Sequence, residues 1–161
     1  MRQRFLPIIL LALCVSCASS SDSEPEQEQT IEVTIDGLLT INESAPSAWV
    51  DEVTITTALA SDTTINATMH QVRFSEDMSD RLDLTLEQIP FTVDYDNAKG
   101  IIRTDTIVPL YMGVPYSDCP FVNIDGYYDL MNNELRFTCI LAHERYGDLP
   151  ATYVGSVVFR S

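Results

Sequence analysis

Basic residues are scarce in this chain of 161 residues: nine Lys and Arg stand against 24 Asp and Glu, for a formal net charge of -15. A surface with this excess of negative charge repels phosphate backbones, so the composition excludes nucleic acid as a partner. The two histidines, His70 and His143, lack partner ligands at the spacing of a zinc site, and we interpret His143 as a solvated loop residue. The sequence also lacks the usual nucleophile and phosphate-binding motifs. We expect no enzyme, no cofactor and no metal.

The N-terminus lacks the ~20 consecutive apolar residues that a membrane-spanning helix needs. A positively charged start precedes a shorter apolar run, 5–13, which is typical of a secretory signal. The sequence Leu-Cys-Val-Ser-Cys that follows resembles a bacterial lipobox, in which the small Ser16 precedes the acylated Cys17. We expect residues 1–16 to be a lipoprotein signal peptide and Cys17 to carry the lipid anchor, which attaches the protein to a membrane without crossing it. An ordinary secretory signal cut nearby is the alternative.

Residues 17–30 lack basic residues and large apolar side chains, and they hold four acids among serines and glutamines. Such a segment cannot offset the entropy of ordering, so we expect a disordered acidic tether. An acidic, serine-rich stretch after the lipidated cysteine resembles the export signals of surface-exposed lipoproteins in the Bacteroidota. The resemblance implies an outer-membrane protein that faces the cell exterior. A plain linker on the periplasmic side is the alternative.

From Thr30 onward no window has the periodicity of a helix, and apolar residues alternate with polar ones instead. The alternation begins with Ile31, Val33, Ile35, Gly37, Leu39 and Ile41, with Leu38 as the exception, and recurs in segments 53–59, 65–69, 82–86, 91–95, 102–110, 135–141 and 153–159. A period of two predicts strands with one buried face and one wet face. Turn-forming residues separate the segments. We expect an all-β domain over 31–161, an antiparallel up-and-down β-barrel of about eight strands or, alternatively, a sandwich.

Two turns can be described further. The pair Asn132-Asn133 predicts a two-residue hairpin turn, because asparagine tolerates positive φ. That turn would place Asp129 opposite Arg136 and Tyr128 opposite Phe137. Segment 94–100 has oxygen-bearing side chains at alternating positions, as calcium loops do, but it lacks the later bidentate glutamate and contains a lysine. We interpret it as a hairpin turn.

Cys119 and Cys139 are the cysteines that follow Cys17, and export to an oxidising compartment would permit a disulfide between them. In the predicted hairpin register, Cys139 faces Gly126 and Cys119 lies ~20 Å further along that strand. This separation exceeds the ~7 Å limit for bridging. We expect Cys139 to be a buried thiol. A curled loop that brings the two cysteines together is the alternative.

Segment 33–41, Val-Thr-Ile-Asp-Gly-Leu-Leu-Thr-Ile, resembles the first strand of the calycin-like (lipocalin-like) β-barrel domains found in many Bacteroidota lipoproteins. Later segments are similar to that family too: 82–90, 122–128 and 153–159. The resemblance covers roughly 31–161 and implies a lipocalin-like barrel without catalytic residues. The loop 113–120 has no counterpart in the family pattern.

An eight-stranded barrel holds either packed side chains or one small ligand. The inward positions mix large and small residues, and we predict an apolar pocket for a small hydrophobic ligand, lined by Ile35, Leu39, Leu84 and Phe137. The alternative is a structural, adhesive or glycan-contacting surface protein with a filled barrel. Tyr111 and Tyr116, near one strand end, would then be placed to stack on a sugar or to line the barrel mouth.

Overall fold

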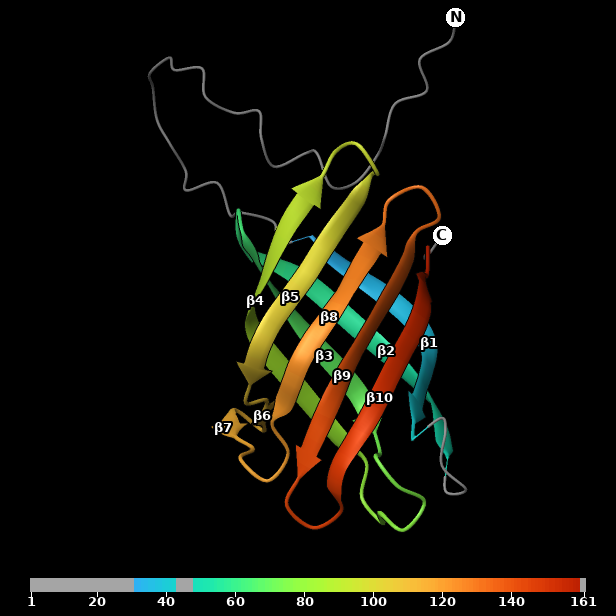
Figure 1. Ribbon diagram of the computed structural model, residues 1–161, viewed down its shortest axis with the longest axis vertical. Coiled ribbons are helices and arrows are strands. Elements are labelled where there is room, and N and C mark those ends of the chain that lie inside the picture. Colours follow the sequence, from blue (N-terminus) through green and yellow to red (C-terminus); the bar gives the residue numbers. More distant parts are fainter. Residues whose placement is uncertain (1–30, 43–47, 160–161) are drawn as a thin grey trace, which may run out of the picture.

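The computed structural model describes residues 31–42 and 48–159, and within these ranges the chain contains strands and no helix (Figure 1). The predicted signal peptide, Cys17 and the predicted tether lie outside the described residues. The strands are β1 (Glu32–Ile41), β2 (Trp49–Ser61), β3 (Thr64–Val72), β4 (Leu82–Asp94), β5 (Lys99–Ile107), β6 (Leu110–Tyr111), β7 (Val114–Pro115), β8 (Phe121–Asp129), β9 (Glu134–His143) and β10 (Gly147–Val157). No membrane-spanning helix is found in this described part.

Eight strands close into an antiparallel barrel (Figure 1). The strands pair around the barrel in the order β1, β2, β3, β4, β5, β8, β9 and β10. Strand β10 then pairs with β1, which closes the barrel. The connections follow chain order, so the topology is up-and-down. The predicted barrel is confirmed, and the sandwich alternative is excluded because the sheet returns to its first strand.

A short hairpin of β6 and β7 enters the wall between β4 and β5. The second half of β4 pairs with β5, from Phe91↔Ile102 to Asp94↔Lys99, whereas its first half pairs with β6 at Leu84↔Tyr111. Strands β4 and β5 therefore separate toward one end of the barrel, and the hairpin extends the sheet from β4 without pairing with β5. Its turn residues, Met112 and Gly113, both have positive φ (53° and 78°), as a type I′ turn requires. This hairpin begins the loop 113–120 that the family pattern did not place.

The barrel interior holds the predicted apolar face of each strand. Its buried residues include Ile35, Leu39, Ile41, Val53, Ile55, Met69, Leu84, Phe121, Leu141 and Tyr153, while Leu38, the exception in the sequence pattern, is exposed on the outer face. Tyr153 is fully buried, and its hydroxyl lies 3.0 Å from the Val53 carbonyl oxygen and 3.2 Å from that of Ile35, to which it can donate. The ring of Phe137 stacks on it at 5.3 Å.

Glycines make room for these aromatic rings. Gly37 and Gly155 pair across β1 and β10, and a Cβ added at Gly155 would lie 2.6 Å from the Tyr153 hydroxyl oxygen. Gly126 pairs with Phe137, and a Cβ at Gly126 would lie 2.6 Å from the Phe137 Cα. Gly37 and Gly155 therefore leave room for the side chain of Tyr153, and Gly126 allows the backbones of β8 and β9 to approach closely.

Three of the bulges that bend the strands into the closed barrel contain a residue with positive φ. Gln71, Gln88 and Asn123 have φ values of 53° to 55° and fall where the pairing register shifts. Two of the displaced backbone amides gain a partner on the neighbouring strand: Gln71 N–H donates to the Asp83 carboxylate (2.7 Å), and Gln88 N–H donates to the Asn66 side chain (2.9 Å). Bulges of this kind increase the local twist that closure needs.

The predicted two-residue turn at 132–133 is wrong by two residues in loop length. Asp129 pairs with Glu134 and Tyr128 with Leu135, so the loop is 130–133 and Asp129 does not face Arg136. Only Asn133 of the Asn pair has positive φ, whereas a type I′ turn needs both. The longer loop forms because the Asp129 carboxylate accepts hydrogen bonds from the backbone N–H groups of Met131 and Asn132.

The β4–β5 connection is stabilised in the same way, by an aspartate at the end of the first strand. The Asp94 carboxylate accepts hydrogen bonds from the backbone N–H of Asn97 (3.1 Å) and from its side-chain amide (2.8 Å), and Ala98 then adopts positive φ. These hydrogen bonds lower the pKa of Asp94. The Asp94 carboxylate, which would begin a calcium loop, is engaged in the turn itself, in agreement with the hairpin interpretation.

Candidate functional site

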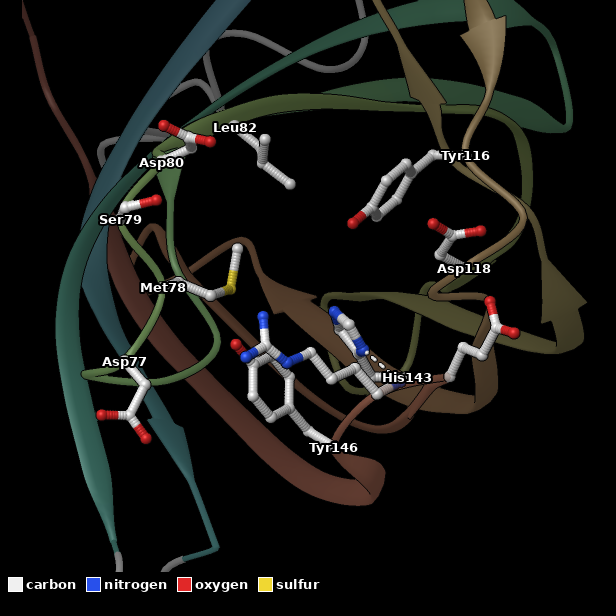
Figure 2. Close-up of a pocket in the computed structure, with 11 residues that line it drawn as sticks. Asp77, Met78, Ser79, Asp80, Leu82, Tyr116, Asp118, His143 and Tyr146 are labelled. Carbon is white, nitrogen blue, oxygen red and sulfur yellow. Dashed lines mark hydrogen bonds between the residues drawn. The ribbon is translucent and has the colours of Figure 1, made fainter.

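A pocket of about 520 Å³ opens at one end of the barrel, where three connections meet (Figure 2). The β3–β4 loop, the segment after β7 and the β9–β10 hairpin supply its walls. The lining residues are Asp77, Met78, Ser79, Asp80, Leu82, Tyr116, Asp118, His143, Glu144, Arg145 and Tyr146. The volume falls within the ~300–1,000 Å³ range of small-molecule sites, and the wall combines aromatic, apolar and charged groups.

The pocket and the start of β1 lie at opposite ends of the barrel. Strand β1 starts at Glu32 at the end where both described termini leave (Figure 1). The other end of β1, Ile41, pairs with Ala151 near the start of β10, beside the pocket. The chain therefore enters β1 at the end of the barrel remote from the pocket.

Backbone hydrogen bonds fix two of the pocket walls against each other. Glu144 N–H donates to the Asp118 carbonyl (2.7 Å) and Ala142 N–H donates to the Pro120 carbonyl (2.9 Å), which extends the β8–β9 ladder beyond both strands. In the third wall, Phe74 N–H lies 3.3 Å from the Met78 sulfur, and Met78 N–H donates to the Ser75 carbonyl. The pocket is thus built on ordered connections.

His143, the last residue of β9, forms the floor of the pocket and is 7% exposed. This burial differs from the solvated loop residue that the sequence suggested, because Phe74 and Tyr146 pack against its ring at 6.3 and 4.6 Å. Its Nδ1 accepts a hydrogen bond from the Arg145 backbone N–H (3.0 Å). Burial is the largest influence on its pKa, which it lowers. The ring is therefore neutral at pH 7, with its proton on Nε2.

The Nε2–H group of His143 points into the hollow and has no hydrogen-bond partner among the described residues (Figure 2). Leu82, Met78 and Tyr116 converge on the same space from the other walls (Figure 2). Tyr116 also contacts Tyr111 edge to face, at 6.2 Å between ring centres. The floor therefore offers one oriented hydrogen-bond donor surrounded by apolar and aromatic surface.

Four carboxylates surround this floor, on Asp77, Asp80, Asp118 and Glu144. All four residues are exposed, and no basic group within the described ranges lies within 4 Å of any of them. The one basic side chain in the lining, Arg145, lies over the ring of Tyr146 at 5.4 Å. The rim is therefore strongly negative, and its carboxylates are free to accept hydrogen bonds from a ligand.

The four residues predicted to line an apolar pocket lie elsewhere. Ile35, Leu39 and Leu84 are at most 1% exposed within the core, and Phe137 is half-buried against Tyr153. None of the four lines the pocket at the barrel end. Tyr116 does line it, and Tyr111 packs directly behind Tyr116. Most of the pocket residues come from loops whose proximity no local pattern in the sequence signals.

The two described cysteines are free, buried thiols. Phe121 pairs with Leu141, and the same register places Cys119 opposite His143. His143 lies four residues after Cys139 on β9. At the usual strand rise this is about 13 Å, too far for a disulfide. Burial raises the pKa of each thiol to about 12, so both stay protonated and unreactive at neutral pH.

His70 lies on the outer face of β3 and does not line the pocket. Its Nε2 is 2.9 Å from the Thr56 hydroxyl, and its Nδ1 is 4.0 Å from Asp83, which instead accepts two hydrogen bonds from Gln71. Within the described part of the chain, no three His, Cys, Asp or Glu residues are arranged to hold a metal ion.

Comparison with protein-family models, with curated proteins and with solved structures returned no match for this chain. The site is therefore interpreted from its own geometry.

Proposed function

We propose that this protein is a non-catalytic, calycin-like outer-membrane lipoprotein of the Bacteroidota type, anchored through Cys17, that contacts glycans with the open end of its barrel. The observation that carries the proposal is the pocket of two tyrosines, one buried histidine donor and four carboxylates at the end remote from the N-terminus. A protein anchored at one end would present this pocket away from the membrane and toward the exterior.

The chemistry of the lining suits a sugar. The apolar C–H face of a pyranose ring packs on an aromatic ring such as Tyr116, while its hydroxyls need both donors and acceptors around the edge. His143 Nε2–H and Arg145 can donate, and the rim carboxylates can accept. An open, mixed polar and aromatic surface of this kind favours a glycan over a purely hydrophobic molecule.

The packed interior of the barrel also favours a glycan over a hydrophobic ligand. A hydrophobic ligand would have to occupy the space that Tyr153, Phe137 and their neighbours fill. The glycan-contacting alternative needs no such space, because its ligand binds outside the core. We therefore prefer it to the small hydrophobic ligand that the mixed inner face first suggested.

Glycan binding can be tested with an array of immobilised neutral, amino and acidic oligosaccharides. The full-length protein, in a detergent without a sugar headgroup, is expected to retain a subset of them. Tyr116→Ala should weaken retention by up to about tenfold, since an aromatic contact contributes about 0.5–1.5 kcal/mol. Tyr95→Ala, at an exposed loop position at the other end of the barrel, is the matched control and should bind like the wild type.

Absence of any retained glycan, or equal binding by the Tyr116 and Tyr95 variants, would contradict the proposal. Native mass spectrometry of the same preparation would then distinguish the hydrophobic alternative. A lipid that co-purifies in stoichiometric amounts would favour an opened interior.

The anchor can be tested separately. Cys17→Ser is expected to move the protein from the membrane fraction to the soluble fraction, because the acyl chains can no longer be attached. Cys14→Ser, three residues earlier, is the control and should leave the protein in the membrane fraction. Protease treatment of intact cells should degrade the wild-type protein if it faces outward. A Cys17→Ser variant that still sediments with membranes would contradict the assignment.

A further inference from the structure

The negative charge of the pocket disfavours acidic glycans and favours positively charged ones. The rim carries four carboxylates without an ion-pair partner among the described residues, and the single arginine of the lining lies against Tyr146. A uronic acid or a sialic acid would bring its own carboxylate into this field and would be repelled. A ligand with a positive charge would be attracted, and it would gain a charge-assisted hydrogen bond wherever its ammonium meets a carboxylate.

Asp118 is the carboxylate best placed to receive such a charge. Its residue is held by the hydrogen bond from Glu144 N–H to its carbonyl, and its side chain stands beside Tyr116 above the floor (Figure 2). Burial raises the pKa of Tyr116, and the negative charge of Asp118 raises it further. Burial lowers the pKa of His143, and the charge of Asp118 opposes part of that shift. Asp77 and Asp80 lie on the opposite wall (Figure 2).

The floor adds a second, independent requirement. His143 is more than nine-tenths buried, and its Nε2–H points into the pocket without a partner. Because this group opens into the pocket, a ligand that places an acceptor oxygen here can take its hydrogen bond. A simple alkylamine lacks that oxygen, whereas a sugar supplies it through a hydroxyl or ring oxygen.

We propose that the pocket selects a positively charged amino sugar, a hexosamine unit with a free amine, whose ammonium meets Asp118 while a sugar oxygen accepts from His143 Nε2–H. This inference rests on the proposed glycan binding and specifies its ligand class. Acetylation of the amine removes the charge and should therefore remove the preference.

The test is a calorimetric titration of the full-length protein at pH 6 with three tetrasaccharides: tetraglucosamine, its fully N-acetylated counterpart and tetragalacturonate. We expect tetraglucosamine to bind about tenfold tighter than the acetylated form, the scale of one charge-assisted hydrogen bond. Tetragalacturonate should not bind. Asp118→Asn should bring the affinities for the first two tetrasaccharides close together.

Asp62→Asn is the matched control, because it removes one exposed carboxylate from the β2–β3 turn, outside the pocket lining. This variant should keep the tenfold preference. If it weakens tetraglucosamine binding as much as Asp118→Asn does, the attraction belongs to the whole acidic protein and the inference fails.

The remaining outcomes separate this inference from the function on which it rests. Equal or tighter binding of the acetylated tetrasaccharide would overturn the amino-sugar specificity and leave glycan binding in place. Failure of all three tetrasaccharides, together with an array that retains no glycan, would overturn both.

Discussion

Replacing Tyr153 with alanine is expected to lower the free energy of unfolding by about 3–5 kcal/mol, the usual cost of truncating a buried aromatic ring. The ring is fully buried between the glycine pair of β1 and β10 and the ring of Phe137, so its removal leaves a cavity that the closed wall cannot collapse to fill. Urea denaturation, followed by circular dichroism and by the fluorescence of the single tryptophan, would measure the change.

Tyr153→Phe separates the hydroxyl from the ring. It keeps the packing and removes the hydrogen bond to the Val53 or Ile35 carbonyl, at a cost of about 1 kcal/mol. If Tyr153→Ala costs less than about 1 kcal/mol, the interior is loosely filled. That result would restore the case for a hydrophobic ligand inside the barrel.

Gly126→Ala should destabilise the protein by about 3 kcal/mol or more, or prevent folding. A Cβ at this position would lie 2.6 Å from the Phe137 Cα and would also overlap the Arg136 carbonyl oxygen. Both are backbone atoms of the paired strand β9, so the strands must move apart, which costs more than ordinary overpacking of side chains.

Gly100→Ala is the matched control, because its Cβ would meet nothing closer than the Tyr128 Cβ at 3.9 Å. We expect this change to alter the free energy of unfolding by less than about 1 kcal/mol. Equal stabilities of the two variants would show that β8 and β9 do not approach each other as closely as the structure indicates.

The strand pattern could be predicted because inside and outside alternate locally along each strand. Leu82, Leu84 and Leu86 all point inward as the sequence indicated, and the isolated Leu38 points outward. Alternation of this kind depends on backbone geometry alone, so one sequence suffices to recognise it. Closure into a barrel was consistent with the same pattern and is confirmed by the pairing of β3 with β4.

The bulges were not predicted, although the sequence contains a signal for them. Phe121 and Ile124 are both buried, and they stand three residues apart in one strand, which a regular strand does not allow. Leu86 and Ile89 show the same spacing across Gln88. Two large apolar residues at this spacing indicate a bulge between them once the strand is known.

The pocket could be predicted only in fragments. The sequence indicates three of its features separately: Tyr116, His143 and the loop 113–120. Their proximity depends on which loops the barrel brings to one end. The burial of His143 depends likewise on Phe74, a residue 69 positions earlier in the chain. Such contacts are set by tertiary structure, and no local periodicity encodes them.

The closed wall also bears on how copies of the protein behave at high local concentration. Within the described residues, the sheet ends at β7, which has two residues, one of them a proline that lacks an N–H group. The half of β5 that follows Ile102 pairs with β8 alone, so neighbouring copies are offered only this short row and β7 as edges onto which another strand could add. Dense display should leave the barrels separate, without the edge-to-edge association that leads to fibrils.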